Sequence, residues 1–121
     1  MILALVVGPR TTVLRDNELL SAVTVPRPGA RFGAAYARFG LREANAIAVA
    51  GVAVALSLND DRTVRSARIA LCAVAPVPKL VKAASRLLAG RVLDESACAQ
   101  AAAMAMAAAE PIADLRGSAE Y

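Results

Sequence analysis

The chain has 121 residues, so it holds one domain or part of one, with enough length to bury a sizeable core. Apolar residues make up 58% of the chain but aromatic residues only 3%, which predicts a core of Ala, Val, Leu and Ile rather than one anchored on large rings. The formal net charge of +4 permits an acidic partner, but the arginines are scattered singly without interleaved aromatic residues, which argues against nucleic-acid binding and favours a solvated basic surface.

Several kinds of catalytic chemistry lack their usual residues. Histidine is absent, which removes the commonest general base, a Ser/His relay and most catalytic zinc sites. The glycines form no G-x-G-x-x-G loop that would cradle a phosphate. Cys72 and Cys98 lie in apolar contexts without C-x-x-C spacing, which predicts buried free thiols and a reducing, cytoplasmic compartment. No uncharged run reaches the ~20 residues of a membrane helix, so the sequence predicts no catalytic residue, no metal site and no membrane span.

Two β-like patterns come first in chain order. In SAVTVP, Val23 and Val25 fall on one face before two prolines end the run. Residues 31–40 alternate as a half-buried strand would, because Phe32, Ala34 and Tyr36 are separated by Gly33 and Ala35. The residues in one phase of this strand are Phe32, Ala34, Tyr36 and Arg38.

A long hairpin is predicted next. Residues 46–58 are almost entirely apolar, so periodicity alone does not separate a buried strand from a buried helix. The valines, the interior Gly51 and the NDDR turn at residues 59–62 favour a strand that pairs with residues 64–74. The pairing should bring Val54, Leu56 and Leu58 beside Val64, Ala67 and Ile69.

Two helices are predicted in the last third. One face of the first is marked by Leu80, Val81, Ala84, Leu87 and Leu88. Gly90 ends this helix, and Asp94 caps a second one that runs through an Ala/Met-rich stretch to Ala109. Met104 and Met106 are expected to fill the core. Together the elements predict an α+β fold, with a three- or four-stranded antiparallel sheet packed against two or three helices.

Four segments, in this order, resemble a known family. They are TVLRDNELLSAVTVP, YARFGLREANAIAVAGVAVALSL, ARIALCAVAPVP and PIADLRGSAEY. Their order and spacing resemble the C-terminal domain of the FAD-binding (medium) subunit of molybdenum hydroxylases. That family contains xanthine dehydrogenase and aerobic carbon monoxide dehydrogenase, and the resemblance covers nearly the entire chain.

The resemblance implies a domain division and two minor cofactor contacts. Residues 1–15 would be the end of a preceding FAD-binding subdomain, and residues 16–121 the flavoprotein C-terminal domain, truncated before its last helix. Contacts with FAD would come from Leu19 or Leu20 and from Arg38, which stands where the family usually has Lys. The subdomains that hold most of FAD are absent from this chain, so the isolated chain is expected to bind no FAD and to lack catalysis.

The resemblance also implies partners. They are the FAD-binding subdomains, an iron–sulfur subunit with [2Fe–2S] clusters, and a molybdenum subunit with molybdopterin. In such an assembly the flavoprotein supports electron transfer from the clusters through FAD to an acceptor. The alternative that the residues leave open is a flavin-free, stand-alone interaction or dimerisation domain.

Overall fold

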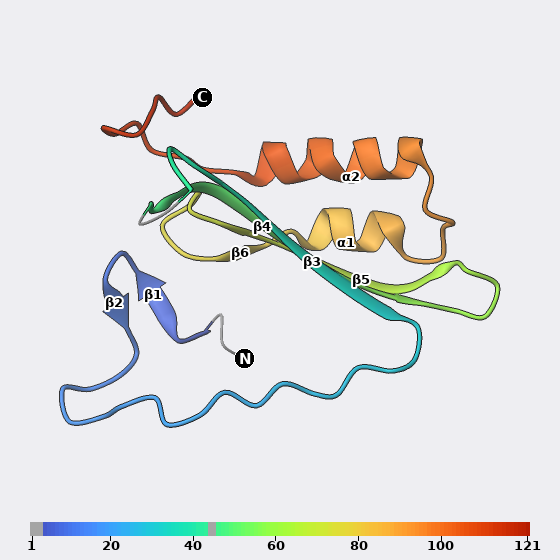
Figure 1. Cartoon of the computed structure of the whole chain (residues 1–121), viewed down its shortest axis with the longest axis horizontal. Coiled ribbons are helices and arrows are strands. Elements are labelled where there is room, and N and C mark those ends of the chain that lie inside the picture. Colours follow the sequence, from blue (N-terminus) through green and yellow to red (C-terminus); the bar gives the residue numbers. More distant parts are fainter. Residues whose placement is uncertain (1–3, 44–45) are drawn as a thin grey trace.

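The computed structural model describes residues 4–43 and 46–121 and shows two sheets and two helices within them (Figure 1). Strands β3 to β6 form one antiparallel sheet in chain order, while β1 pairs with β2 in a separate hairpin. The elements are β1 (Val6–Gly8), β2 (Thr11–Thr12), β3 (Phe32–Gly40), β4 (Ala48–Leu58), β5 (Val64–Cys72), β6 (Lys79–Leu80), α1 (Lys82–Leu88) and α2 (Glu95–Ala108). For these residues the predicted α+β class is confirmed.

The hairpin of β4 and β5 has the predicted register. Val54 pairs with Ile69, Leu56 with Ala67 and Leu58 with Val64. The chain reverses at the NDDR turn, where the Asn59 amide donates to the Thr63 carbonyl at 2.8 Å and the Arg62 amide to the Asn59 carbonyl at 3.1 Å. Strand β4 is apolar on both faces, so its hydrophobic pattern alone does not specify the register of its pairing with β5. The polar turn between the two strands fixes this register.

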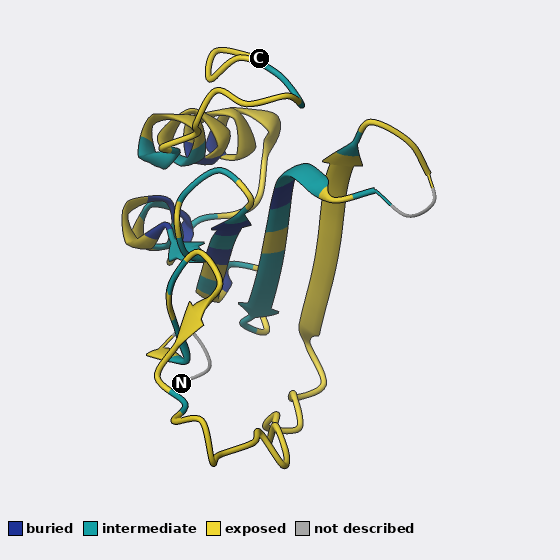
Figure 2. Ribbon diagram, turned by 90° about the vertical axis from the view of Figure 1, so that its left-hand side faces the viewer, coloured by how far each residue is buried: buried dark blue, intermediate teal, exposed yellow. Residues whose placement is uncertain are grey.

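Strand β3 forms where the sequence predicts it, but its predicted half burial is wrong. Phe32 pairs with Ser57 and the ladder continues to Arg38 opposite Gly51, yet all residues of β3 except Gly40 are exposed. Figure 2 shows β3 at the edge of the sheet with no helix against it. The alternating pattern of this segment therefore belongs to a strand that no described helix or strand covers on either face.

The strand predicted around Val23 and Val25 is absent, so this prediction is wrong. Residues 13–31 contain turns but no strand or helix, and both valines are exposed. A strand needs a partner for its backbone groups, and the nearby Pro26 and Pro28 have no amide hydrogen to donate. The segment instead leads to the edge of the sheet, where the Arg31 carbonyl accepts from the Leu58 amide at 2.9 Å.

Helix α1 starts later than predicted. Leu80, expected on the helix, lies in β6 and pairs with Ala70 of β5, and the Val81 amide donates to the Ile69 carbonyl at 2.8 Å. Pro78 cannot donate a backbone hydrogen bond, so the chain joins the sheet just after it and the helix follows. The end of α1 is as predicted, since Gly90 adopts a φ of +78° that suits glycine.

Helix α2 has the predicted cap, but its buried side is not the predicted one. The Asp94 carboxylate accepts a hydrogen bond from the Ala97 amide at 2.6 Å. Ala97 is buried, whereas Met104 and Met106 are exposed, so the expectation that these methionines fill the core is wrong. The buried residues of α2 are Ala97 and Ala101, so small side chains lie where α2 packs against α1.

The cysteines are free but less buried than predicted. Cys98 is exposed on α2, which contradicts its predicted burial, and Cys72 at the end of β5 is only half-buried. Neither thiol belongs to the buried core. The apolar residues next to each cysteine in the sequence are mostly small, so they do not enclose the thiol. The prediction of burial from these neighbours was therefore too strong.

The core lies on one side of the molecule. Helix α1 packs against β5 and α2 packs against α1, so both helices lie on the same side of the sheet (Figures 1 and 2). The fully buried hydrophobic residues come from β5, the two helices and the residue before α1; they are Val64, Ile69, Leu71, Val81, Ala84, Leu88, Ala97 and Ala101. No residue of β3 belongs to this core.

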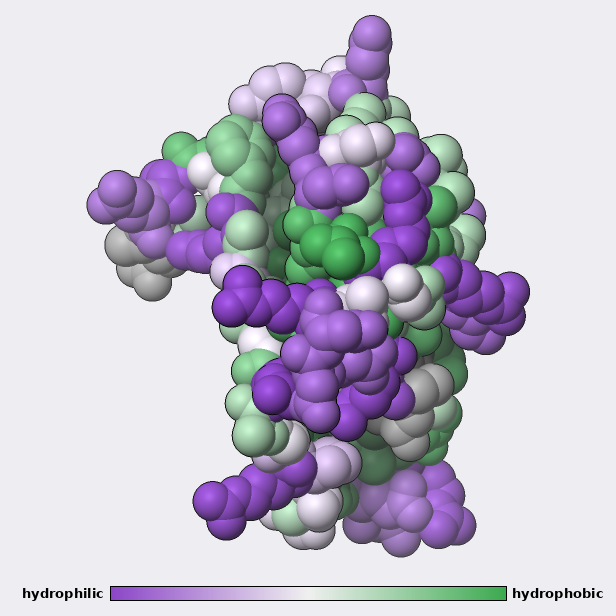
Figure 3. All heavy atoms as spheres, turned by 90° about the vertical axis from the view of Figure 1, so that its right-hand side faces the viewer, coloured by the Kyte–Doolittle hydropathy of each residue, from purple (hydrophilic) through white to green (hydrophobic). Residues whose placement is uncertain are grey.

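The end of the molecule that carries the β4–β5 turn is mostly hydrophilic on its surface. Figure 3 looks at this end and shows hydrophilic side chains around a small hydrophobic patch.

Among the described residues, neither helix has the length and apolar character that a bilayer crossing requires.

Candidate functional site

The side of the sheet that faces away from the helices forms the first candidate surface, which we call the open face. Val52, Val54 and Leu56 of β4 pack against the core, so Gly51 and the other alternate residues of β4 point the opposite way. The register then places on this open face Tyr36 and Arg38 from β3, Gly51 from β4, and Cys72 from β5.

Tyr36 reaches across β4 to Cys72. The phenol oxygen lies 3.4 Å from the Cys72 sulfur, and Gly51 lies beneath this contact, opposite Cys72 in the β4–β5 pairing. A β-carbon on Gly51 would approach the sulfur to 2.4 Å and the phenol oxygen to 2.8 Å. The hydrogen bond with Cys72 is the main cause that raises the pKa of Tyr36 above its usual value. This contact is not predicted from the sequence, although a glycine in a central strand is a known sign of close approach.

Arg38, a predicted FAD contact, lies near the end of β3 on the open face. Its guanidinium donates to the Glu43 carbonyl at 2.9 Å and to the Ala46 carbonyl at 3.1 Å, so it holds both sides of the β3–β4 loop. These bonds use two of the five N–H donors of an arginine. Among the described residues, Arg38 thus has a local positioning role.

Leu19 and Leu20, the other predicted contacts, lie on the irregular segment before β3. Both are exposed, at 81% and 50% of their maximal area. Just before them, Arg15 and Glu18 form an ion pair across a turn, and this pairing with Arg15 lowers the pKa of Glu18. Arg38 lies on β3 of the main sheet, whereas Leu19 and Leu20 lie on the irregular segment before it, so the predicted contacts come from two different parts of this chain.

A second surface, which we call the apolar groove, lies on the helix side of the sheet. It has a volume of about 500 Å³ and runs between α2 and the uncovered parts of β3 and β4. Its lining includes Ala37, Phe39, Val52, Ala102, Ala105 and Met106. An apolar groove of this kind suits an apolar helix or strand better than a charged ligand.

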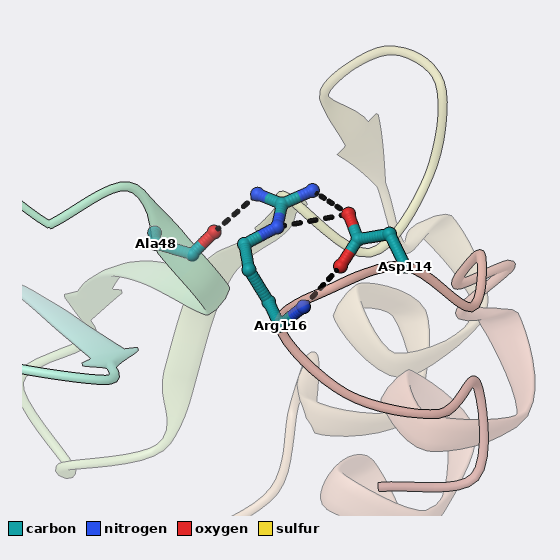
Figure 4. Close-up of polar contacts among 3 residues, drawn as sticks. All are labelled: Ala48, Asp114 and Arg116. Atoms are coloured by element: carbon teal, nitrogen blue, oxygen red, sulfur yellow. Dashed lines mark hydrogen bonds and ion pairs between the residues drawn. The ribbon is translucent and has the colours of Figure 1, made fainter.

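The C-terminal segment is tied to the sheet near one end of this groove. Arg116 forms an ion pair with Asp114 and also reaches the Ala48 carbonyl at the start of β4 at 3.5 Å (Figure 4). Arg116 lowers the pKa of Asp114, chiefly through their hydrogen bond. The ring of Tyr121 meets that of Phe39 edge to face, with centroids 5.9 Å apart.

The described residues offer little to a metal ion or a phosphate. They contain no cluster of three or more His, Cys, Asp or Glu side chains that could hold a metal. On the open face, Arg38 and the exposed Tyr36 fit one edge of a planar cofactor such as FAD. They do not fit its pyrophosphate, which needs several convergent backbone amides. The site is therefore suited to a supporting contact.

The comparisons with known proteins agree with this arrangement. Residues 34–121 match the family model of the CO dehydrogenase flavoprotein C-terminal domain. The chain is 36% identical over 114 residues to the carbon monoxide dehydrogenase medium chain of Afipia carboxidovorans, and 35% identical over 114 residues to that of Hydrogenophaga pseudoflava. Each match covers 94% of this chain but 39% of the relative.

Two solved structures have the same fold. The carbon monoxide dehydrogenase from Hydrogenophaga pseudoflava superposes with a TM-score of 0.87 at 36% identity, and quinoline 2-oxidoreductase from Pseudomonas putida 86 with 0.84 at 30% identity. Each superposition covers 98% of this chain and 40% of the other.

An antiparallel sheet with both helices on one side, matched over most of its length, defines the class as the C-terminal domain of molybdenum-hydroxylase flavoproteins. Within it, this chain belongs to the CO dehydrogenase flavoprotein C-terminal domain family. The predicted resemblance is confirmed. The chain spans about two-fifths of the length of the curated relatives it matches.

Proposed function

We propose that this chain closes one side of the FAD site in the medium subunit of a molybdenum hydroxylase. The rest of the site would lie on what we call the flavin-bearing part, meaning the subdomains that hold most of FAD. FAD, when bound, supplies the chemistry that passes electrons from iron–sulfur clusters to an external acceptor. The role of this chain is to cover the cofactor, to exclude water and to donate hydrogen bonds from Arg38, with apolar contact from Leu19 or Leu20.

The observation that carries this proposal is the open face together with the bare strand β3. An edge strand exposed on both sides is a liability for a protein that works alone, because its unpaired groups and apolar side chains invite association. On this surface a cation and an aromatic ring, Arg38 and Tyr36, lie among small residues. A surface of this kind suits a partner that brings a planar anionic cofactor.

The partners and compartment form part of the same proposal. The assembly would contain an iron–sulfur subunit with [2Fe–2S] clusters and a molybdenum subunit with molybdopterin. The name "medium chain" of one relative and the molybdenum cofactor named for the solved carbon monoxide dehydrogenase are consistent with such partners. A cytoplasmic location is supported by the two cysteines, which are both free.

We also propose domain boundaries. Residues 1–15 belong to the end of the flavin-bearing part, which is supported by the β1–β2 hairpin, a sheet separate from the main one. Residues 16–121 belong to the C-terminal domain. Near the end of this domain the Ser118 hydroxyl accepts from the Tyr121 amide at 3.1 Å, which is the pattern of a helix N-cap.

The test is the FAD content of two preparations. The isolated chain should purify without FAD, because one charge-assisted hydrogen bond contributes about 1.5–3 kcal/mol whereas micromolar affinity needs about 8 kcal/mol. Combined with the flavin-bearing part it should give a complex with one FAD. Stoichiometric FAD on the isolated chain would contradict this division of the site. A stable complex without FAD would instead favour the flavin-free interaction domain, which the exposed apolar residues of β3 also suit.

A further inference from the structure

Three adjacent strands of the open face are joined by one side-chain contact. Tyr36 of β3 and Cys72 of β5 approach to 3.4 Å across β4. A side chain on Gly51 of β4 would block this contact, because a β-carbon there would come within 2.4 Å of the sulfur and 2.8 Å of the phenol oxygen. Glycine at this position is therefore required by the contact, since the strand conformation itself does not need it.

The contact holds an exposed aromatic ring in one orientation. Tyr36 is 58% exposed although its hydroxyl end is fixed by Cys72. Its neighbours on the open face include Ala34 on the same strand and Ala53, its cross-strand partner. An aromatic ring that covers a glycine of the next strand is a common way to stabilise a sheet, and that structural role uses the ring alone. Here the hydroxyl is also fixed, and much of the ring still faces outward.

The second feature of this surface is a guanidinium two residues along the same strand. Arg38 lies opposite Gly51 and is held by the carbonyls of Glu43 and Ala46. The ring and the guanidinium thus both have fixed positions on one face. A planar heteroaromatic ring that bears carbonyl oxygens fits such a pair, because it can stack against the phenol and accept from the guanidinium.

We propose that Tyr36 is a further contact residue for the flavin ring system, and that Gly51 and Cys72 are its positioning residues. This inference rests on the proposed function, since it takes the open face as the surface that meets FAD. It extends that function because neither residue belongs to the contacts predicted from the sequence. Tyr36 packs against the ring, and Cys72 fixes the phenol so that its orientation is set before the cofactor arrives.

The test measures FAD affinity and flavin fluorescence in the complex of this chain with the flavin-bearing part. Tyr36→Ala should raise the FAD dissociation constant about three- to tenfold, the range expected for loss of an aromatic pair. It should also increase flavin fluorescence, because a phenol against the flavin quenches it. Tyr36→Phe keeps the ring, so it should restore most of the affinity, with the quenching still reduced. Phe32→Ala, an aromatic truncation on the same strand and in the same phase, is the matched control and should change neither quantity.

Gly51→Ala tests the positioning role. Its new β-carbon would displace Tyr36, so FAD affinity should fall as in Tyr36→Ala. Gly33→Ala is the control, because no atom outside its immediate neighbours lies within 4 Å of the added β-carbon. When Tyr36→Phe and Cys72→Ala have already removed the phenol oxygen and the sulfur, Gly51→Ala should cause much less further loss.

The two hypotheses fail in different ways. A wild-type complex that binds FAD, with Tyr36→Ala and Tyr36→Phe unchanged in affinity and fluorescence, would overturn the role of Tyr36 and leave the proposed function intact. A wild-type complex that contains no FAD would overturn both. If Tyr36→Ala does not fold, the fluorescence of Tyr36→Phe decides, since this variant keeps the ring over Gly51.

Discussion

The region around β5 and the edge strand β3 are stabilised in different ways. Around β5, side chains of α1 and α2 bury Ile69, Leu71 and Ala84 in a closed core. At β3, the strand is attached through its pairing with β4, and its side chains are exposed on both faces (Figure 2). The part around β5 is thus stabilised by its own packing, whereas β3 has a formed backbone but no helix packed against it.

Under the proposed function, this difference indicates where the domain would meet the flavin-bearing part. Burial of apolar side chains is the main source of folding stability, so a strand that is formed but not buried contributes little to the stability of the isolated chain. Its regular ladder nevertheless prepares a surface for a partner. We infer that burial of β5 stabilises the isolated domain, whereas burial of β3 contributes to the free energy of binding in the complex.

The largest effect should come from the covered half. Ile69→Ala removes a buried side chain between the sheet and α1, and we expect a loss of about 2–5 kcal/mol in the free energy of unfolding. Chemical denaturation of the isolated chain measures it. The matched control is Ile112→Ala, because Ile112 is exposed, and it should change stability by less than about 0.5 kcal/mol. Equal effects of the two changes would contradict the core described here.

The reverse behaviour is expected at β3. Ala34→Glu places a charge on an exposed strand, so the isolated chain should keep its unfolding free energy within about 0.5 kcal/mol. In the complex the same carboxylate would be buried without a partner, and affinity for the flavin-bearing part should fall at least about tenfold. Titration calorimetry measures this loss. Ala99→Glu, on the exposed side of α2, is the control; a similar loss there would refute the assignment of β3 as the contact.

A smaller effect is expected at the start of α2. Asp94→Ala removes the side chain that accepts from the Ala97 amide, which should cost about 1 kcal/mol of unfolding free energy. Asp94→Asn retains an acceptor at the cap and should cost much less. If both variants lose the same stability, the charge of Asp94 matters rather than its hydrogen bond.

The smallest effect concerns the Tyr36–Cys72 contact. The contact raises the pKa of Tyr36, so the folded state holds the phenol proton more tightly than the unfolded state does. Its contribution to stability is therefore present below the usual tyrosine pKa of about 10 and is lost as the pH rises through the folded-state pKa. In a Tyr121→Phe background, phenolate absorbance reports Tyr36 alone, and Cys72→Ala should lower its pKa. An unchanged titration would show that Cys72 does not hold the phenol.

The sequence predicted the structure correctly where neighbouring residues alone determine the conformation. The NDDR turn determined the β4–β5 pairing, and Asp94 followed by Glu95 marked the start of α2. Predictions from local patterns were wrong where the conformation or burial of a residue depends on contacts with elements far away in the sequence. Leu80 has helical spacing with Leu87 and Leu88, but its pairing with β5 decides its conformation. Met104 and Met106 are long apolar residues, but the close approach of α1 and α2 favours alanine at the buried positions.

The candidate site was predictable only in part, for a related reason. The strand that carries Arg38 follows from alternation, but its use of the Glu43 and Ala46 carbonyls depends on how the β3–β4 loop folds back. The Tyr36–Cys72 contact needs the registers of two strand pairs at once, and sequence spacing supplies neither. Gly51 was the available signal, because an interior glycine on a central strand indicates that other atoms pass close to it.

Amide hydrogen exchange along β3 tests the central claim most directly, by comparing the isolated chain with its complex with the flavin-bearing part. We predict fast exchange of β3 amides in the isolated chain and strong protection in the complex, while β5, α1 and α2 change little. If β3 is equally protected in both preparations, or if protection appears on α1 instead, the strand is not the surface that the partner covers and the account is wrong.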